Sequence, residues 1–406
     1  MPGYAAVRPQ DPWAGNATLA LALTLVGACS TATAVRGENT ALRSNQPLDV
    51  CPARMPPSRA PGGGDVVSLA IGVVNQCAVM GDQTVMCRGN NGMGELGVGV
   101  GGLQRSPVAV PGLSGVVDVQ LSGNGAVCAL TGSGEVWCWG SNRAGELGIG
   151  HERDEACGEH ASRRDYCRRH PTRVQGIPRA VRLVVGGQLV CIVAVDRSVW
   201  CWGTSVEGGR RVEHATPFQV APPSDLIDLA NVYDHVVMTY AGGRVVGESE
   251  NIPREIPPGA RLVANFSGDI CAILEDRSVR CRWQGVSCAP PGIEAPAECV
   301  TLRETGLRCV ADLAIGFDHS CALHLDGRVS CWGSNDYGQT GQDVAASSTC
   351  HQSRCTPRPL PVSGIDRVVS VFTGGFQTCA IRDDRSVWCW GVVGGASTHV
   401  PVRVVW

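Results

Sequence analysis

The sequence predicts an all-β protein built from repeated hairpins, and three observations support this prediction. Cysteine pairs ten positions apart recur along the 406 residues, and six of them fall in the register of a longer repeat. The 52 glycines, the 25 prolines and the many valines suit short strands joined by tight turns. The 21 cysteines are too many for a cytosolic chain without metal clusters, and their regular spacing is typical of disulfides in a secreted protein.

Each ten-residue interval predicts one hairpin clasped by a disulfide. A three-residue loop at Leu325, Asp326 and Gly327 would set Cys321 directly opposite Cys331. Opposed residues of a non-hydrogen-bonded antiparallel pair lie about 4.5 Å apart at Cα, within disulfide range. We therefore expect these cysteines to make the hairpins rigid. The predicted clasps are Cys77–Cys87, Cys128–Cys138, Cys191–Cys201, Cys271–Cys281, Cys321–Cys331 and Cys379–Cys389.

A longer repeat surrounds the cysteine pairs. In the second copy, Cys138-Trp139-Gly140 is followed by Gly145-Glu146-Leu147-Gly148, and the sixth copy repeats this order from Cys331 to Gly341. A degenerate copy places Val237 and Gly247 at the two cysteine positions, and loss of both is what a bonded pair predicts. The copies lie near residues 66–115, 116–179, 180–224, 225–259, 260–309, 310–366 and 367–406.

These residues resemble the repeats of the regulator of chromosome condensation family, from about Val66 to Trp406. The resemblance implies a seven-bladed β-propeller for residues 63–406, with a cross-strand disulfide in six blades. It also implies that the last strand, from Pro401 to Val405, completes the first blade and closes the ring. The tryptophans that follow the second cysteine predict packing between blades. They are Trp139, Trp202, Trp332 and Trp390.

The N-terminus predicts export. Residues 1–29 are interpreted as a lipoprotein signal peptide, because Val26-Gly27-Ala28-Cys29 resembles a bacterial lipobox whose cysteine, here Cys29, is lipidated. The alternative is an ordinary signal peptide cut near Ala32 or Ala34. Residues 30–62 lack an apolar period and predict a flexible tether. The expected location is the bacterial cell envelope, at the outer membrane or cell surface.

Three insertions interrupt the repeat, near residues 151–171, 284–309 and 342–356. They occupy equivalent positions, so in a propeller they would share one face, and long loops on one face favour binding. The first insertion is the most charged and predicts a protein interface. The alternative is a solvated loop stapled by a Cys157–Cys167 disulfide. The candidate partner-binding residues are Arg153, Arg163, Arg164, Tyr166, Arg168 and Arg169.

The remaining cysteines predict further disulfides. Cys350 and Cys355 would staple the third insertion, and Cys288–Cys299 is the first choice in the second, which leaves Cys51–Cys309. No metal or cofactor is expected. One alternative is kept open, since a tetrahedral zinc site would fit the spacing of four possible ligands. They are Cys157, His160, Cys167 and His170.

These features favour a non-enzymatic protein-binding scaffold tethered to the cell envelope. The net charge of −3 gives no electrostatic case for nucleic acid. No catalytic motif is recognised, and the His319-Asp318 pair recurs at His235-Asp234, which argues for a structural hydrogen bond. The expected partner is an unidentified protein, with membrane contact through the lipid only. The alternative is a secreted inhibitor of an extracytoplasmic enzyme, and a propeller lyase or hydrolase ranks third.

Overall fold

The structure is a computed structural model that describes residues 51–406, apart from a set of internal gaps. The signal peptide, Cys29 and residues 30–50 lie outside the described residues. Over the described part of the chain, no helix is both long and apolar enough to span a membrane. The gaps are residues 100, 152–154, 158–165, 223–224, 233–234, 241–243, 248–255, 258, 265–269, 283–301 and 351–352.

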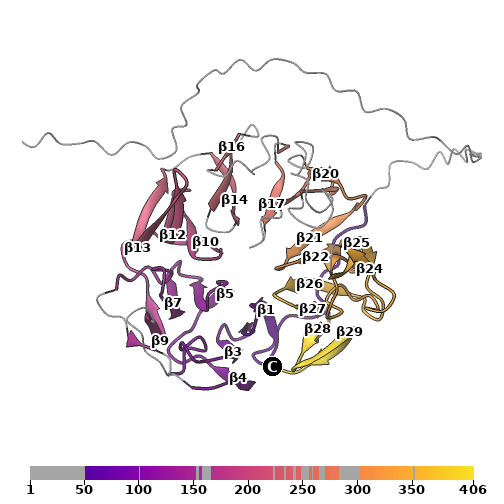
Figure 1. The fold of residues 1–406 in the computed structure, drawn as a ribbon, viewed down its shortest axis with the longest axis horizontal. Coiled ribbons are helices and arrows are strands. Elements are labelled where there is room, and N and C mark those ends of the chain that lie inside the picture. The colour runs from indigo at the N-terminus through magenta and orange to yellow at the C-terminus, as the bar shows by residue number, and fades with distance from the viewer. Residues whose placement is uncertain are drawn as a thin grey trace, which may run out of the picture. The chain divides into compact units, whose positions relative to one another are not determined.

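Seven antiparallel sheets follow one another around a ring, which is a seven-bladed β-propeller (Figure 1). In each blade the strands pair in chain order, except that the second and sixth blades carry an extra strand inside their insertions. The fourth blade has three described strands. The first strand of each blade lines the centre of the ring.

The strands of blades one to three have these bounds: β1 (Val66–Ile71), β2 (Gln76–Met80), β3 (Val85–Gly89), β4 (Gln104–Ala109); β5 (Val116–Leu121), β6 (Ala126–Thr131), β7 (Val136–Ser141), β8 (Glu155–Ala156), β9 (Tyr166–Arg173); β10 (Ala180–Val185), β11 (Leu189–Ala194), β12 (Val199–Glu207), β13 (Arg210–Ala221).

The strands of blades four to seven have these bounds: β14 (Leu226–Val232), β15 (His235–Tyr240), β16 (Val245–Val246); β17 (Arg261–Ala264), β18 (Ile270–Ile273), β19 (Val279–Arg282), β20 (Arg303–Glu304); β21 (Val310–Ile315), β22 (His319–His324), β23 (Val329–Ser334), β24 (Ser348–Cys350), β25 (Ser353–Pro361); β26 (Val368–Thr373), β27 (Gln377–Arg382), β28 (Val387–Val393), β29 (Ala396–Val404).

The hairpin clasps are confirmed. The second and third strands pair so that the two cysteines stand directly opposite each other, as Cys321 and Cys331 do in β22 and β23. Their Cα atoms lie 4.1 Å apart, and the other five pairs lie between 4.0 and 4.2 Å. All twelve of these cysteines are fully buried. The clasps therefore lie inside the blades, where they hold the hairpin register.

The three-residue hairpin loop is also confirmed. The Gly327 amide donates to the His324 carbonyl at 3.0 Å, and the His324 amide donates to the Arg328 carbonyl at 2.9 Å. Gly327 has a φ of 81°, in the left-handed region that favours glycine. Other blades place Gln83, Arg197, Arg277 or Arg385 at this position with φ between 62° and 71°. The loop geometry is therefore kept even where glycine is absent.

The predicted ring closure is wrong. The last strand, β29, pairs with β28 in the seventh blade, and the first blade completes itself with β4. No strand is exchanged, because residues 104–109 already supply the outer strand of the first blade. The ring closes instead through side-chain packing between these two blades. Val66, Leu69 and Met80 share a buried cluster with Ile381 and Val387.

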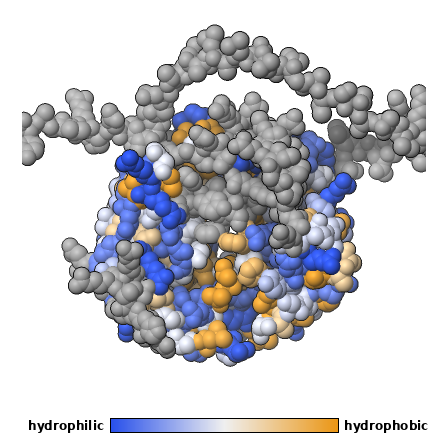
Figure 2. Space-filling model, in the orientation of Figure 1, coloured by the Kyte–Doolittle hydropathy of each residue, from blue (hydrophilic) through white to orange (hydrophobic). Residues whose placement is uncertain are grey.

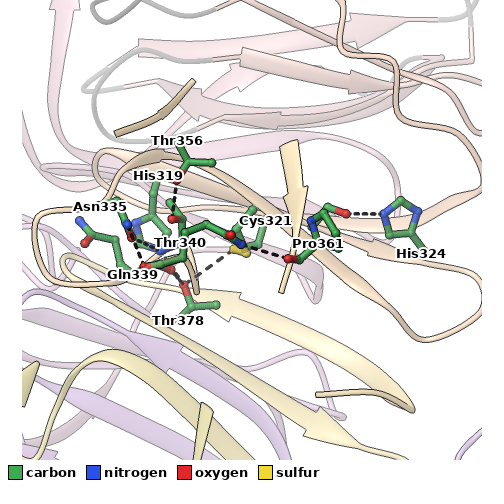
Figure 3. The surroundings of a disulfide bond; sticks show 12 residues. His319, Cys321, His324, Asn335, Gln339, Thr340, Thr356, Pro361 and Thr378 are labelled. Carbon is green, nitrogen blue, oxygen red and sulfur yellow. Dashed lines mark hydrogen bonds between the residues drawn. A yellow bond between two sulfur atoms is a disulfide. The ribbon is translucent and has the colours of Figure 1, made fainter. Parts of the chain in front are cut away.

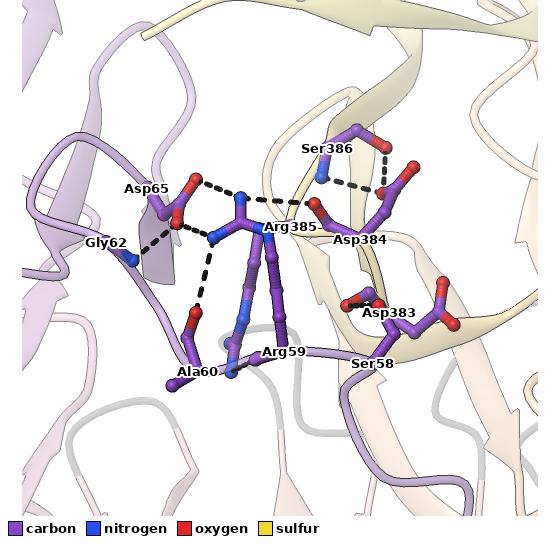
Figure 4. A network of polar contacts seen from close by, with 9 residues as sticks. All are labelled: Ser58, Arg59, Ala60, Gly62, Asp65, Asp383, Asp384, Arg385 and Ser386. Atoms are coloured by element: carbon purple, nitrogen blue, oxygen red, sulfur yellow. Dashed lines mark hydrogen bonds and ion pairs between the residues drawn. The ribbon is translucent and has the colours of Figure 1, made fainter.

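Residues 55–65 form a strap across three blades. The Met55 amide donates to the Leu325 carbonyl of the sixth blade at 3.0 Å, and the Ser58 amide donates to the Asp383 carbonyl of the seventh at 3.1 Å. Arg59 then binds Asp65 beside the first blade, with Nη2 to Oδ1 at 2.7 Å (Figure 4). This part of the predicted tether therefore lies along the propeller, because its backbone finds hydrogen-bond partners there.

Tryptophans join neighbouring blades, as the repeat predicts. Trp139 of the second blade donates its Nε1–H to the Glu95 carbonyl of the first at 2.9 Å. Trp202 of the third blade donates in the same way to the Glu146 carbonyl of the second at 2.9 Å. Both indoles are fully buried. These side chains therefore belong to the structure of the ring and are not available to stack on a ligand.

Candidate functional site: the insertion face

The order of the strands defines two faces of the ring. In an antiparallel blade, the connection from the first to the second strand and the connection from the third to the fourth lie at the same end. We call this end the insertion face, because the described parts of the insertions are connections between third and fourth strands. The clasped hairpin turns lie at the other end, which we call the hairpin-turn face. The strap contacts the hairpin-turn face.

The first insertion forms a hairpin of β8 and β9 that extends the second blade. Arg169 Nε lies 2.9 Å from Glu155 Oε2, and Arg168 Nη1 lies 3.8 Å from Glu155 Oε1. The Arg168 side chain is only 14% exposed. Tyr166 is 37% exposed and lies beside the His151 ring, with centroids 5.5 Å apart. Arg153, Arg163 and Arg164 lie outside the described residues.

This arrangement changes the interpretation of the charged insertion. The two arginines of β9 bind a carboxylate of the same hairpin, so part of their charge is used to shape the loop. Of the predicted interface residues that the structure describes, Tyr166 and Arg169 are 37% and 36% exposed and are presented at the surface. The positive charge of Arg168 was predicted to face a partner, and its low exposure argues against that role.

The zinc alternative is wrong for two of its four ligands. Cys157 and Cys167 are joined in a disulfide, with Cα atoms 6.0 Å apart, and a disulfide offers no thiolate to a metal. His170 Nδ1 lies 3.2 Å from the Gly97 carbonyl of the neighbouring blade. His160 lies outside the described residues. Within the described ranges, no group of three or more potential ligands could hold a metal.

The other cysteines are described only in part. Cys350 and Cys355 are joined in the sixth-blade insertion, with Cα atoms 5.7 Å apart. Cys51 and Cys309 are both disulfide-bonded. The Cys309 carbonyl accepts from the Leu325 amide at 2.8 Å, and Leu325 is also the residue that holds Met55 of the strap. The Cys51–Cys309 pairing stays a prediction, and Cys288 and Cys299 lie outside the described residues.

The predicted structural role of His319 agrees with its surroundings. His319 is 1% exposed, and its Nε2 lies 2.8 Å from the Thr378 hydroxyl of the next blade. Thr378 in turn donates to the Gln339 carbonyl at 2.8 Å, so it must accept its other hydrogen bond from a protonated His319 Nε2 (Figure 3). Burial lowers the pKa of His319 to about 3. A neutral, buried imidazole that ties two blades together is not placed for acid/base catalysis.

Apolar side chains that the sequence interpretation missed gather on the insertion face across the first, sixth and seventh blades. Val73 and Val74 are 52% and 63% exposed, and Phe317 and Tyr337 are 37% and 40% exposed. The Tyr337 and Phe376 rings lie 4.9 Å apart. We call these five residues the apolar rim.

Backbone contacts make the rim continuous. The Gly375 amide donates to the Gly72 carbonyl at 3.3 Å, and the Phe317 amide donates to the Gly374 carbonyl at 3.4 Å. The turns that carry Val73, Phe317 and Phe376 therefore touch one another. Four of these residues lie one or two positions after the glycine that precedes each hairpin cysteine by five positions, so an aligned comparison of those two positions would have found them.

Comparisons with known proteins agree with the repeat. Sequence profiles of the regulator of chromosome condensation (RCC1) repeat match residues 116–146 and 310–339 in one case and 133–193 and 326–381 in another. The chain carries regulator of chromosome condensation repeats. The matched residues fall in the second, third, sixth and seventh blades, which retain the cysteine clasp.

Relatives with known names are distant. The chain is 23% identical over 358 residues to the regulator of chromosome condensation of Mus musculus, an alignment that covers 76% of this chain and 80% of the mouse protein. It is 22% identical over 339 residues to the ultraviolet-B receptor UVR8 of Arabidopsis thaliana, covering 81% and 66% of the two chains. It thus spans slightly less than two thirds of the length of that receptor.

Solved structures share the fold. The crystal structure of Kap60 bound to yeast RCC1 (Prp20) contains a chain that superposes with a TM-score of 0.64 at 17% identity, covering 90% of this chain and 91% of that one. The crystal structure of Prp20p from Saccharomyces cerevisiae, described with its binding properties to Gsp1p and histones, gives a TM-score of 0.50 at 19% identity, covering 84% and 76%. At these identities the likeness shows the propeller fold alone.

Proposed function

We propose that this chain is a non-enzymatic, protein-binding scaffold tethered to the cell envelope through a lipid on Cys29, and that the insertion face holds its partner. The apolar rim is the observation that carries the proposal. It presents five apolar residues across three blades, with Val74 63% exposed at its edge. Contiguous exposed apolar surface of this kind is typical of interaction sites.

Rigidity supports the same conclusion. The clasps hold six of the seven hairpins, and the tryptophans link one blade to the next, so the rim is presented by a preformed surface. A surface that is already ordered loses little conformational entropy when it binds. A protein with the same fold, yeast RCC1 (Prp20), has been crystallised bound to Kap60.

The test compares one substitution on the two faces. Val74 and Val195 are both 63% exposed, and Val195 lies in the β11–β12 turn on the hairpin-turn face. Capture of envelope proteins by the exported, oxidised chain should yield a species that Val74→Asp loses and Val195→Asp retains. We expect at least a tenfold loss of affinity for that species, because a buried carboxylate would face apolar groups.

Two outcomes would reject parts of the proposal. Equal loss in both variants, or no loss in either, would show that the insertion face is not the binding surface. Retention of the protein in the soluble fraction with an unmodified Cys29 would reject the lipid tether and would not bear on the binding surface. A variant that lacks residues 152–165 tests separately whether the first insertion contributes to capture of the partner.

A further inference from the structure

The centre of the ring contains a cavity of about 440 Å³. The first strands of the first, second, sixth and seventh blades supply most of its lining, and the turns after first strands supply most of the remainder, with Val185 of β10 and Arg261 of β17. It extends from Ser68 at the hairpin-turn end of β1 to Val73 at the insertion end. On the face that Figure 2 shows, apolar side chains gather at the inner edge of the ring, over β1 and β5.

A belt of polar residues surrounds this channel near the hairpin-turn face. The belt takes one residue from each of the seven first strands. In each blade this residue pairs with a residue of the second strand, the one that lies two positions after the first clasp cysteine or, in the fourth blade, after Val237. Going around the ring, these residues are Ser68, Asp118, Arg182, Asp228, Arg261, Asp312 and Ser370.

Charges alternate along the belt, and neighbouring blades pair them. Arg182 binds Asp228 between the third and fourth blades. Arg261 Nη2 lies 2.7 Å from Asp312 Oδ1 between the fifth and sixth. These two pairs leave Asp118 as the one carboxylate of the belt without an ion pair among the described residues. Three carboxylates stand against two guanidinium groups, so the belt carries one excess negative charge.

Asp118 is held in place without being neutralised. Its Oδ2 accepts from Gln120 Nε2 at 2.9 Å, and Gln120 is fixed by the Leu183 carbonyl at 2.9 Å and the Val185 amide at 3.0 Å. The charged group that acts on Asp118 from a neighbouring first strand is the Arg182 guanidinium, which is already bound to Asp228, and Ser68 lines the same cavity from the first blade. A desolvated carboxylate in this position gains most from a cation that enters the channel.

The cavity that contains Asp118 also has an apolar lining. Ile71, Leu121 and Ile315 line it from the first strands of the first, second and sixth blades, and each is partly exposed. A ligand of this cavity needs a short apolar stem and a positively charged end.

We propose that the central channel is a binding site for an organic cation, an alkylguanidinium or alkylammonium group, whose charge pairs with Asp118 and whose stem contacts Ile71 and Leu121. A metal ion fits less well, because one carboxylate does not supply the roughly six oxygen ligands that calcium or magnesium takes. The cation belongs either to a free ligand or to an Arg or Lys side chain of a partner. Asp118 lies toward the hairpin-turn end of this cavity, whereas Val73 and Phe317 of the apolar rim line its insertion end.

Protonation of Asp118 sets the pH dependence. Burial raises the pKa of Asp118 to about 6, and the cation needs the ionised form. The fraction of ionised Asp118 increases about tenfold between pH 5 and pH 7.5. The affinity for a cation should therefore rise about tenfold over this range, whereas an uncharged analogue should show no such rise.

The test is calorimetric titration of the full exported chain with agmatine, with 1,4-butanediol as the uncharged control. A capped Gly-Arg-Gly peptide is the second probe, which asks whether a partner's side chain is the better source of the cation. We expect saturable 1:1 binding of agmatine or of the peptide. Asp118→Asn should weaken it at least tenfold. Asp366→Asn, which removes a 72% exposed carboxylate elsewhere, should leave it unchanged.

Ser68→Arg keeps the proposal testable if Asp118→Asn fails to fold. It would place a cation next to Asp118 from the first blade, and binding of either probe should be lost while the melting temperature is kept. Binding of agmatine alone identifies a free ligand, and binding of the peptide alone identifies a partner's side chain. The proposal is overturned if neither probe binds at millimolar concentration, or if binding survives in both variants.

Discussion

At the scale of single residues, His319 gives the propeller a dependence on pH. Its folded-state pKa, near 3, lies below the value of 6.5 that it takes in the unfolded chain, so the unfolded state binds the proton more tightly. The stability it contributes is present above pH 6.5 and is lost as the pH falls. Between pH 7 and pH 5 this loss amounts to about 2 kcal/mol.

Denaturant unfolding of the wild-type chain and of His319→Gln at these two pH values measures the effect. Glutamine does not titrate, and its amide can still donate to Thr378, so the variant should show a smaller loss of stability at pH 5. Asp118, whose pKa is raised to about 6, makes the chain more stable as the pH falls, opposite to His319. Both chains contain Asp118, so its contribution cancels in the comparison. Parallel pH profiles would refute the assignment.

At the scale of elements, the loops that follow the Trp-Gly segments of the second and sixth blades each bury a polar side chain. Glu146 is 0% exposed and accepts from the Ala144 amide at 2.7 Å, and Gln339 is equally buried and accepts from the Tyr337 amide at 2.9 Å. Burial raises the pKa of Glu146. Because the pKa of Glu146 is higher in the folded chain than in the unfolded chain, the stability that Glu146 contributes is lost as the pH rises through its folded-state pKa.

Glu146→Gln should therefore stabilise the chain by about 1 kcal/mol at pH 7, because the amide keeps the hydrogen bond and avoids burying a charge. The gain should shrink toward pH 4, where the carboxyl is neutral in both states. Thermal melts at both pH values measure it. Glu135→Gln, an exchange at a partly exposed position that pairs with Arg173, is the matched control. A destabilised Glu146→Gln at pH 7 would contradict the argument.

The clasps and hairpin loops were predictable because they depend on spacing alone. A ten-residue interval with a turn residue at its midpoint allows one register, and the structure has it at Cys321–Cys331. The pairing of Arg168 with Glu155 was not predictable, because it depends on how the insertion folds back on itself. The belt was also hidden, since its alternation of charge appears only when residues far apart in the chain are aligned around the ring.

At the scale of the whole molecule, ring closure shows the limit of prediction from a resemblance. Exchange of the last strand was expected, yet β29 stays with β28 and the first blade uses β4. A closed ring without strand exchange depends on contacts between its first and last blades. The strap adds such contacts, since it binds the sixth and seventh blades before it enters the first at Asp65.

Removal of the strap should therefore weaken the ring at this junction. The matched comparison is between a chain that begins at Pro52 and one that begins at Gly63, because both lack Cys51 and therefore contain the same cysteines. The shorter chain loses the hydrogen bonds of the Met55 amide, the Ser58 amide and the Ser58 hydroxyl, at about 1 kcal/mol each. For a domain of this size, we expect the melting temperature to fall by about 3 °C.

Hydrogen exchange should locate the loss, with faster exchange at the Gly375 amide that joins the seventh blade to the first and unchanged exchange in the third-blade hairpin. Equal melting temperatures for the two chains would show that packing of Leu69 and Met80 against the seventh blade is sufficient to close the ring.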